Sequence, residues 1–361
     1  MAQEPFVLQG KIDGTGPKTM AYLVYPDASG EKELTDSVKL VNGSFRFRGN
    51  VVSVRMATLS IIDPAKQAFT RLTSDGENIL EVYLEKGDIV VNGTLDNLKN
   101  ADVWGTKTNE DQNKWKRLHE PLEKELIELK FKKNTVDYLN MGEEQRNAIN
   151  LRIKAISGKS DSIFYSFVAE NPASFFSLVL LYKKLLPNQN PDVGAMEKLF
   201  NNLSEDLKTK KIAKFINNAI QALKRTKLGA KPNFVAYTAA NHPVKLSDYA
   251  GKYVLVEFWA SWCIPCRADI PKLKKVYKKY NPKGFNILSI SIDTNKAAWL
   301  SAINSENMAW AQAGDLKGEL ALKYFINAVP FNFLVNPDGE IIAVNLRVEA
   351  LEKTLDKLPF K

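Results

Sequence analysis

The chain has 361 residues, of which 45% are hydrophobic and 25% charged, and its formal net charge at pH 7 is +9. This length predicts two or three folding units, and the composition excludes a largely disordered or fibrous chain. The longest apolar stretch, residues 175–182, falls far short of the roughly 20 residues that a membrane-spanning helix needs, so we expect no transmembrane segment. The lysines recur in pairs within amphipathic patterns, as in residues 272–279, which is typical of a solvated helix face and argues against nucleic-acid binding.

The first part of the chain has the pattern of antiparallel β-structure. Apolar and polar residues alternate, as in residues 44–48, and Asn42-Gly43, Lys86-Gly87-Asp88 and Asn92-Gly93 are typical of tight hairpin turns. The sequence therefore predicts a small β-sandwich or barrel-like domain over residues 1–105.

From about residue 106 the hydrophobic period becomes that of helices. Apolar residues recur three or four positions apart at Trp115, Leu118, Leu122, Leu126 and Leu129. We expect helical hairpins or a bundle over residues 106–226, with a break at Asn171-Pro172.

From residue 227 to residue 361, strands alternate with helices. The expected strands are residues 253–259, 285–292, 331–335 and 341–345, and the expected helices lie near residues 263–280, 297–304, 316–325 and 349–358. Alternation of this kind predicts a central sheet with helices on both faces. The turn sequence of residues 336–339 predicts a hairpin that joins the last two strands. The whole chain is therefore expected to be a multidomain α/β protein.

The only two cysteines, Cys263 and Cys266, have two residues between them and follow the apolar run of residues 253–259. When a strand delivers a C-x-x-C motif to the first turn of a helix, backbone N–H groups and the helix dipole favour a thiolate at the first sulfur. The second sulfur then lies one turn deeper, close enough to close a small disulfide ring. This pattern predicts thiol-disulfide redox chemistry.

Other chemistries lack the residues that they need. A structural zinc site takes about four nitrogen or sulfur ligands, whereas the histidines are His119 and His242, far apart in sequence and in no ligand spacing. A Cys/His or Ser/His nucleophile would need a histidine beside it. A peroxidase of the peroxiredoxin class would need a threonine a few residues before its cysteine, which residues 259–262 do not supply. We therefore expect no metal site.

Further motifs accompany the two cysteines in the last third of the chain. In chain order they are Gly229-x-x-Pro232-x-Phe234, Leu246-Ser247-Asp248-Tyr249-x-Gly251-Lys252, Val256-Glu257-Phe258-Trp259-Ala260-Ser261-Trp262-Cys263-x-Pro265-Cys266-Arg267, Pro271 and Val329-Pro330. This part of the chain resembles the TlpA/ResA-like thioredoxins, a family of secreted thiol-disulfide oxidoreductases. The resemblance implies a thioredoxin fold for residues 227–361. The β-then-helical part looks like a region commonly fused ahead of such thioredoxins in some Gram-negative bacteria.

The resemblance also implies roles for single residues. Cys263 would attack the substrate and form a mixed disulfide, and Cys266 would resolve it. Glu257 would be the family's buried acid, which exchanges a proton with Cys266; the alternative is a strand-end glutamate that reaches solvent or a lysine. Pro330 would be the family's cis-proline, which lies across from the disulfide and docks the substrate backbone; the alternative is a trans proline that starts an edge strand.

Four more residues are expected to support the site. Pro265 would set the first helical turn and influence the redox potential. Trp259 and Trp262 would form an aromatic shell or only pack in the core, and Arg267 would tune the thiolate or only cap the surface. Phe331-Asn332 stands where the family often has small hydroxyl residues, a departure that concerns substrate preference.

The resemblance implies an enzyme that reduces disulfides of secreted or periplasmic proteins, with a membrane thiol donor as its source of electrons and no cofactor besides the Cys263/Cys266 disulfide. The start of the chain has no leader pattern, which fits either a cytosolic protein or one whose signal peptide has been removed. The resemblance favours the second, a periplasmic or otherwise exported protein. Two alternatives stay open: a redox-gated adaptor whose residues 1–226 bind a partner, and a thiol reductant in cytochrome c maturation.

Overall fold

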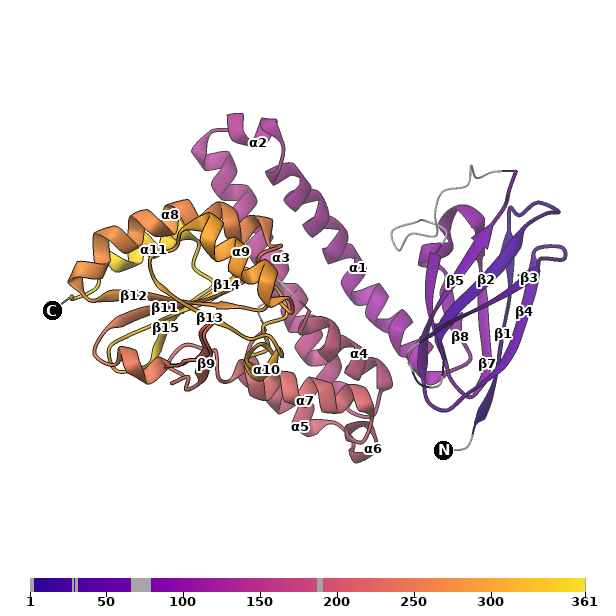
Figure 1. The fold of residues 1–361 in the computed structure, drawn as a ribbon. Coiled ribbons are helices and arrows are strands. Elements are labelled where there is room, and N and C mark those ends of the chain that lie inside the picture. Colours follow the sequence, from indigo (N-terminus) through magenta and orange to yellow (C-terminus); the bar gives the residue numbers. More distant parts are fainter. Residues whose placement is uncertain (1–2, 28, 30–31, 66–78, 187–190, 361) are drawn as a thin grey trace. The chain divides into compact units, whose positions relative to one another are not determined.

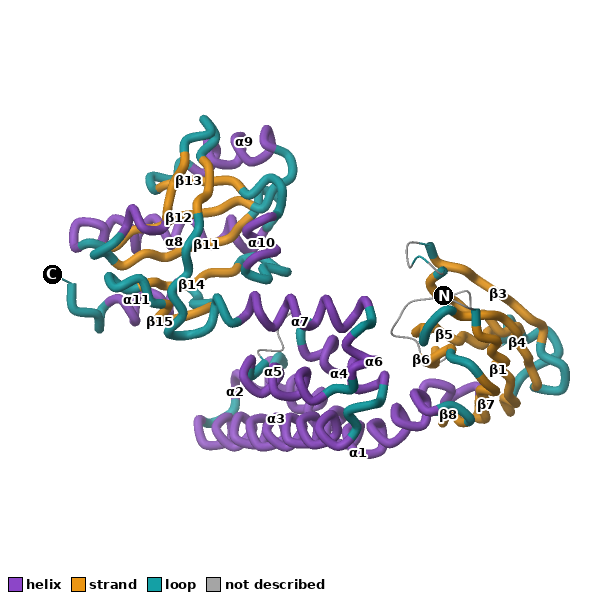
Figure 2. The backbone as a smooth tube through the Cα atoms, turned by 90° about the horizontal axis from the view of Figure 1, so that it is seen from below, coloured by secondary structure: helices purple, strands orange, loops and turns teal. Residues whose placement is uncertain are grey.

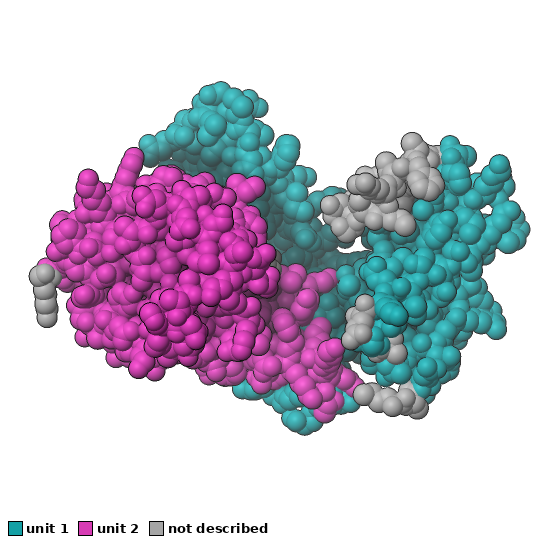
Figure 3. All heavy atoms as spheres, viewed as in Figure 1, with its two compact units in different colours: residues 1–181, 201–208 teal, residues 182–200, 209–361 magenta. Residues whose placement is uncertain are grey.

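The computed structural model describes residues 3–27, 29, 32–65, 79–186 and 191–360. The chain divides into two compact units (Figure 3): residues 1–181 with 201–208, and residues 182–200 with 209–361. The helices that the sequence assigns to one segment, residues 106–226, are shared between these units. The division into residues 1–105, 106–226 and 227–361 therefore stays a prediction.

The first unit contains two four-stranded sheets (Figure 1). Their strands are β1 (Glu4–Asp13), β2 (Met20–Pro26), β3 (Glu33–Lys39), β4 (Ser44–Val51), β5 (Arg55–Ile62), β6 (Ile79–Leu84), β7 (Gly87–Thr94) and β8 (Asp102–Trp104). One sheet has the order β4-β1-β7-β8 and the other β3-β2-β5-β6. Alternate residues of both sheets, such as Leu8 on β1 and Leu23 on β2, enter one hydrophobic core. The expected β-sandwich is confirmed.

Of the three tight turns expected in this sandwich, one is present. Asn42 and Gly43 have φ angles of +51° and +78° and connect β3 to β4 through a bridge between Val41 and Ser44. The turn expected at residues 86–88 is wrong, because Gly87 and Asp88 already lie inside β7. The turn expected at residues 92–93 is also wrong, because both residues lie inside β7.

A glycine is needed within β7 for a different reason. A side chain at Gly93 would bring its Cβ to 3.1 Å from the Cβ of Ala101. The chain returns to this strand through the 3₁₀ helix η1 (Leu95–Asn100) before β8 begins. Gly93 therefore permits close approach of two chain segments, a use of glycine that looks in sequence like a turn signal.

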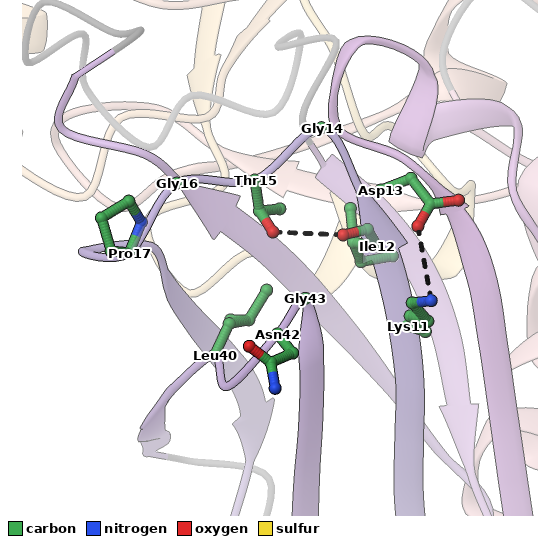
Figure 4. Close-up of a pocket in the computed structure, with 10 residues that line it drawn as sticks. All are labelled: Lys11, Ile12, Asp13, Gly14, Thr15, Gly16, Pro17, Leu40, Asn42 and Gly43. Carbon is green, nitrogen blue, oxygen red and sulfur yellow. Dashed lines mark hydrogen bonds and ion pairs between the residues drawn. The ribbon is translucent and has the colours of Figure 1, made fainter.

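A pocket of about 420 Å³ lies at one end of the sandwich (Figure 4). It is lined by residues 11–17 together with Leu40, Asn42 and Gly43. Its charged side chains pair with each other, Lys11 with Asp13 at 3.9 Å, and the Thr15 hydroxyl donates to the carbonyl of Ile12. The pocket is therefore built by the loops next to the Asn42-Gly43 turn and contains neither cysteine.

The helices of the middle of the chain are α1 (Lys107–Lys133), α2 (Val136–Asn140), α3 (Glu143–Glu170), α4 (Phe175–Lys184), α5 (Val193–Asn202), α6 (Glu205–Lys208) and α7 (Lys211–Leu223). The break expected at Asn171-Pro172 is confirmed, since α3 ends at Glu170 and α4 begins at Phe175. Among the residues with described positions, no helix is both long and apolar enough to cross a bilayer.

Helix α1 is fixed to the sandwich by two buried asparagines one turn apart. The Asn109 amide accepts from the backbone N–H of Tyr83 at 2.9 Å and donates to the carbonyl of the same residue at 2.8 Å. Asn113 makes the same pair of bonds to Val103, at 3.2 and 2.8 Å. Tyr83 and Val103 lie on β6 and β8, which are edge strands of the two sheets. Each amide therefore takes the place of a neighbouring strand.

The second unit contains a seven-stranded mixed sheet, which confirms the expected fold (Figure 2). Its strands are β9 (Val235–Tyr237), β10 (Pro243–Lys245), β11 (Tyr253–Trp259), β12 (Phe285–Ser291), β13 (Ala311–Gly314), β14 (Phe331–Val335) and β15 (Ile341–Val344). Their order is β10-β9-β13-β12-β11-β14-β15, with β11, β12 and β13 parallel and the outer strands antiparallel.

Helices cover both faces of this sheet (Figure 1). They are α8 (Ile264–Tyr280), α9 (Lys296–Glu306), α10 (Glu319–Lys323) and α11 (Val348–Leu355), with short 3₁₀ helices η2 (Leu246–Tyr249) and η3 (Asn281–Lys283). Leu255 and Trp259 of β11 pack with α8, α9 and α11, whereas Val256 and Phe258 pack with the α10 side. By this alternation Glu257 lies on the α8 face of the sheet.

Candidate active site

The two cysteines lie where β11 gives way to α8, and they are joined by a disulfide bond. Cys263 is the N-cap residue of α8, and its sulfur accepts a hydrogen bond from the Cys266 backbone N–H at 3.2 Å. Cys263 is 4% exposed and Cys266 is 0% exposed. A reacting thiol can therefore reach the disulfide only through Cys263, and the helix N-terminus stabilises the thiolate that forms there on reduction.

The residues that flank the cysteines differ in exposure. Trp262 is 64% exposed and Ile264 is 81% exposed, so both present apolar surface beside the disulfide. Trp259 is buried in the core cluster that includes both cysteines. Pro265 occupies the first turn of α8, where its missing N–H removes no helical hydrogen bond. Of the two tryptophans, only Trp262 is placed to touch an approaching molecule.

The Arg267 side chain forms an ion pair with Glu306. Its Nε donates to Oε1 of Glu306 on α9 at 2.8 Å, and the Glu306 side chain is mostly buried. The pair ties the start of α8 to the end of α9. This contact favours the reading of Arg267 as a residue that serves the fold.

Glu257 is 4% exposed, and its Oε2 accepts a hydrogen bond from the Ser289 hydroxyl at 2.8 Å. The alternative in which it reaches solvent or a lysine is therefore wrong. Burial raises the pKa of Glu257 from its usual 4.5 to about 7; the Ser289 bond lowers the pKa, and the negative charge of Asp269 on α8 raises it. A carboxyl with this pKa changes charge close to neutral pH.

The peptide bond between Val329 and Pro330 is cis, so the alternative of a trans proline is wrong. Pro330 directly precedes β14, whose first residue, Phe331, is paired with Phe258 near the end of β11. Since β11 runs from Tyr253 toward the cysteines, this antiparallel register places Pro330 at the same end of the sheet as the disulfide.

Asn332 has a structural contact that the sequence does not reveal. Its amide donates to the carbonyl of Leu346 at 2.9 Å and accepts from the N–H of the same residue at 3.0 Å. The side chain thus fixes the segment that follows β15. Asn332 therefore has a structural role in this chain, and the effect of Phe331-Asn332 on substrate preference stays a prediction.

Sequence reasoning missed a carboxylate that holds the loop before Cys263. Asp293 is buried, and its two oxygens accept from the Ser261 N–H at 2.8 Å and the Ser261 hydroxyl at 2.7 Å. The Ser291 hydroxyl donates to the same carboxylate at 2.6 Å. The available signal was an acid at the end of an apolar strand, where an unpartnered charge is costly.

Within the described ranges, no three His, Cys, Asp or Glu side chains are grouped so that they could hold a metal ion.

Comparison with known proteins agrees with this geometry. Residues 229–344 match the AhpC/TSA family, and residues 6–112 match the domain of unknown function DUF4369. The thiol-disulfide oxidoreductase ResA of Bacillus thuringiensis subsp. konkukian is 32% identical over 111 residues, which are 31% of this chain and 64% of that protein.

Two solved structures are each similar to a little over a third of this chain. The thioredoxin domain of a thiol-disulfide oxidoreductase from Bacteroides vulgatus is 33% identical, with 36% of this chain and 96% of that chain covered and a TM-score of 0.35. A thiol-disulfide oxidoreductase from Bacteroides fragilis is 34% identical, with 37% and 100% covered and a TM-score of 0.34.

The mixed sheet with a disulfide at the N-terminus of α8 defines a thioredoxin-like domain. Residues 229–344 of this chain form such a domain of the AhpC/TSA family, and it is of the ResA/TlpA type. The chain spans 64% of the length of the first ResA relative that it matches.

Proposed function

We propose that this protein is a thiol-disulfide oxidoreductase that reduces disulfides of exported proteins. The observation that carries the proposal is the Cys263–Cys266 disulfide at the N-cap of α8. This position favours a thiolate at Cys263, which is the species that attacks a disulfide. The similarity to ResA supports the same class of chemistry.

The reaction starts from the reduced pair. The Cys263 thiolate attacks one sulfur of a substrate disulfide, so that a Cys263–substrate bond forms and the other substrate sulfur leaves as a thiolate. The Cys266 thiolate then attacks the Cys263 sulfur, which forms the Cys263–Cys266 disulfide seen here and releases the second substrate sulfur. Two electrons pass from the pair to the substrate.

Glu257 handles the proton of the second step. Cys266 is buried and must lose its proton before it attacks, and Glu257 lies on the α8 face of the sheet with a pKa raised by burial to about 7. A carboxyl with this pKa accepts a proton and gives it up again close to neutral pH. Glu257 is thus the base for Cys266 during substrate reduction and the acid when the disulfide is reduced again.

The proposed cycle needs a dithiol donor to reduce the Cys263–Cys266 disulfide after each turn. We assign this role to a membrane thiol donor and place the protein outside the cytoplasm, as the TlpA/ResA-like character of the domain suggests. The redox-active disulfide serves as the only redox group.

The test is catalytic turnover. The full chain, with dithiothreitol as the reductant, should reduce the disulfides of insulin at substoichiometric concentration, and Cys263→Ser should abolish the activity. Slow stoichiometric exchange with one tightly bound protein, without turnover, would instead support a redox-gated adaptor.

A further inference from the structure

Glu257 is the end of a chain of three buried side chains that come from separate segments of the second unit. The indole Nε1 of Trp310, just before β13, donates to the Ser289 hydroxyl at 2.8 Å. The Ser289 hydroxyl in turn donates to Oε2 of Glu257 at 2.8 Å. All three residues are buried.

The chemistry of the donors gives this chain a direction. An indole N–H can only donate, whereas a serine hydroxyl has one hydrogen and accepts through its lone pairs. Because Trp310 occupies a lone pair of Ser289, the hydroxyl hydrogen is directed away from Trp310 and toward Glu257. Successive bonds in one direction polarise each other, so the Ser289 hydroxyl becomes a better donor to a carboxylate.

The strand register makes Ser289 the neighbour that can donate a hydrogen bond to the Glu257 carboxylate. Ser289 on β12 and Asn332 on β14 lie opposite Glu257 on its two sides. The Asn332 amide nitrogen donates to Leu346 instead. Within the described part of the chain, no group donates a hydrogen bond to Oε1 of Glu257, so this oxygen is left for the proton that is exchanged.

The groups around Glu257 act in opposite directions. Burial and the negative charge of Asp269 on α8 raise its pKa, while the bond from Ser289 lowers it. Cys266 on α8 is bonded to Cys263 in the disulfide and carries no charge in this state. The hydrogen-bond chain therefore opposes the two effects that keep the carboxyl protonated.

We propose that Ser289 and Trp310 are positioning residues that hold the Glu257 carboxyl in place and favour its ionised form. This inference rests on the proposed role of Glu257 as the proton partner of Cys266. Ser289 acts on Glu257 directly, and Trp310 acts through Ser289.

The experiment is a titration of the Glu257 carboxyl in the oxidised full chain by infrared spectroscopy. The band of the protonated carboxyl is assigned by its loss in Glu257→Gln. Ser289→Ala should raise the midpoint of this band by about one pH unit, since a hydrogen bond to the charged form is removed. Trp310→Phe should raise the midpoint by a smaller amount, because the hydroxyl remains but is no longer oriented.

Ser291→Ala is the matched control. Ser291 is a buried serine on the same strand whose hydroxyl donates to Asp293 rather than to Glu257, so the midpoint should not move. An unchanged or lowered midpoint in Ser289→Ala overturns the proposal. If Ser289→Ala does not fold, Trp310→Phe is used in its place, and an unchanged or lowered midpoint in that variant overturns the proposal. A carboxyl that stays ionised throughout the titration of the wild type overturns it as well.

Insulin reduction by the same variants separates this proposal from the proposed function. If the wild type reduces insulin, the pH inflection of its rate should move upward in Ser289→Ala together with the infrared midpoint. When Ser289→Ala is combined with Glu257→Gln, the pH inflection of the rate should be the same as in Glu257→Gln alone. If the wild type does not reduce insulin at any pH but the infrared midpoint still moves, the proposed function fails and the hydrogen-bond chain stands.

Discussion

The β-sandwich and the thioredoxin-like domain both bury polar side chains, but they use them differently. At the edges of the sandwich, the neutral amides of Asn109 and Asn113 on α1 each satisfy both backbone groups of one edge-strand residue. In the thioredoxin-like domain, Glu257 is ionisable, lies on the α8 face of the sheet and has a pKa of about 7. The contrast separates polar groups that complete a hydrogen-bond ladder from one that can change charge near neutral pH.

The largest expected effect lies at the cysteines. Cys266→Ser removes the resolving sulfur but leaves Cys263 at the N-cap of α8, so the variant should lose turnover and accumulate a mixed disulfide with its substrate. Mass spectrometry of the full chain after reaction with a disulfide-bonded peptide would detect the adduct. Cys263→Ser is the control, because it lacks the more accessible sulfur and should form none. Adducts of equal yield in both variants would contradict the assigned order of attack.

Glu257→Gln tests whether the buried acid lowers stability at high pH. The folded-state pKa of about 7 exceeds the usual 4.5, so the folded chain binds more protons and the wild type loses stability as the pH rises from 4.5 through 7. The loss is about 3 kcal/mol by linkage. Glu257→Gln should remove it and be the more stable protein at pH 8, with little difference at pH 4.

The measurement is denaturant unfolding of the oxidised full chain followed by tryptophan fluorescence. Four of the six tryptophans, at positions 259, 262, 299 and 310, lie in the thioredoxin-like domain and report on it. Asp338→Asn removes an exposed carboxylate from the same domain and should leave the pH dependence as in the wild type. A variant that stays as pH-dependent as the wild type would contradict the assigned pKa.

Asn109→Ala tests the buried neutral amides that bind the edge strands of the sandwich. The substitution leaves the backbone N–H and carbonyl of Tyr83 without their partner in a buried position, at an expected cost of about 2 kcal/mol in the free energy of unfolding. The cost should not depend on pH between 5 and 8, because the substitution neither adds nor removes an ionisable group. Asn140→Ala, at an exposed position at the end of α2, is the matched control. A pH-dependent cost would break the distinction between neutral amides and the buried acid.

The sequence predicted the parts of the thioredoxin-like domain that leave a local signal. The strands β11 and β14 begin and end where expected, and the two cysteines lie at the start of a helix as the motif predicts. The strands β9, β10 and β13 were missed, because three or four residues are too few to show an alternating pattern. The strand β15 is equally short, but the turn sequence of residues 336–339 precedes it.

The partners of the buried groups were not predictable in the same way. Ser289 contacts Glu257 only because β11 and β12 pair in one particular register, and two strands that are apolar along nearly their whole length carry no local pattern from which that register can be predicted. Asn332 was considered for substrate preference, whereas its amide binds the backbone of Leu346 across a hairpin. In the sandwich, the glycines at positions 87 and 93 look like turn signals although neither forms a hairpin.

The smallest expected effect concerns Arg267, for which the sequence left two roles open. Its guanidinium is paired with Glu306, and it is partly exposed, so Arg267→Ala should change the free energy of unfolding by less than about 1 kcal/mol. Because the positive charge of Arg267 is already paired with Glu306, the reduction potential of the Cys263/Cys266 pair should shift by less than about 20 mV in this variant. The potential is measured by equilibration in glutathione buffers and trapping of free thiols. Glu306→Gln removes the partner instead and releases the guanidinium. If either variant shifts the potential well beyond this limit, Arg267 tunes the thiolate, and the α8–α9 ion pair belongs with Glu257 among the charged groups that control the chemistry.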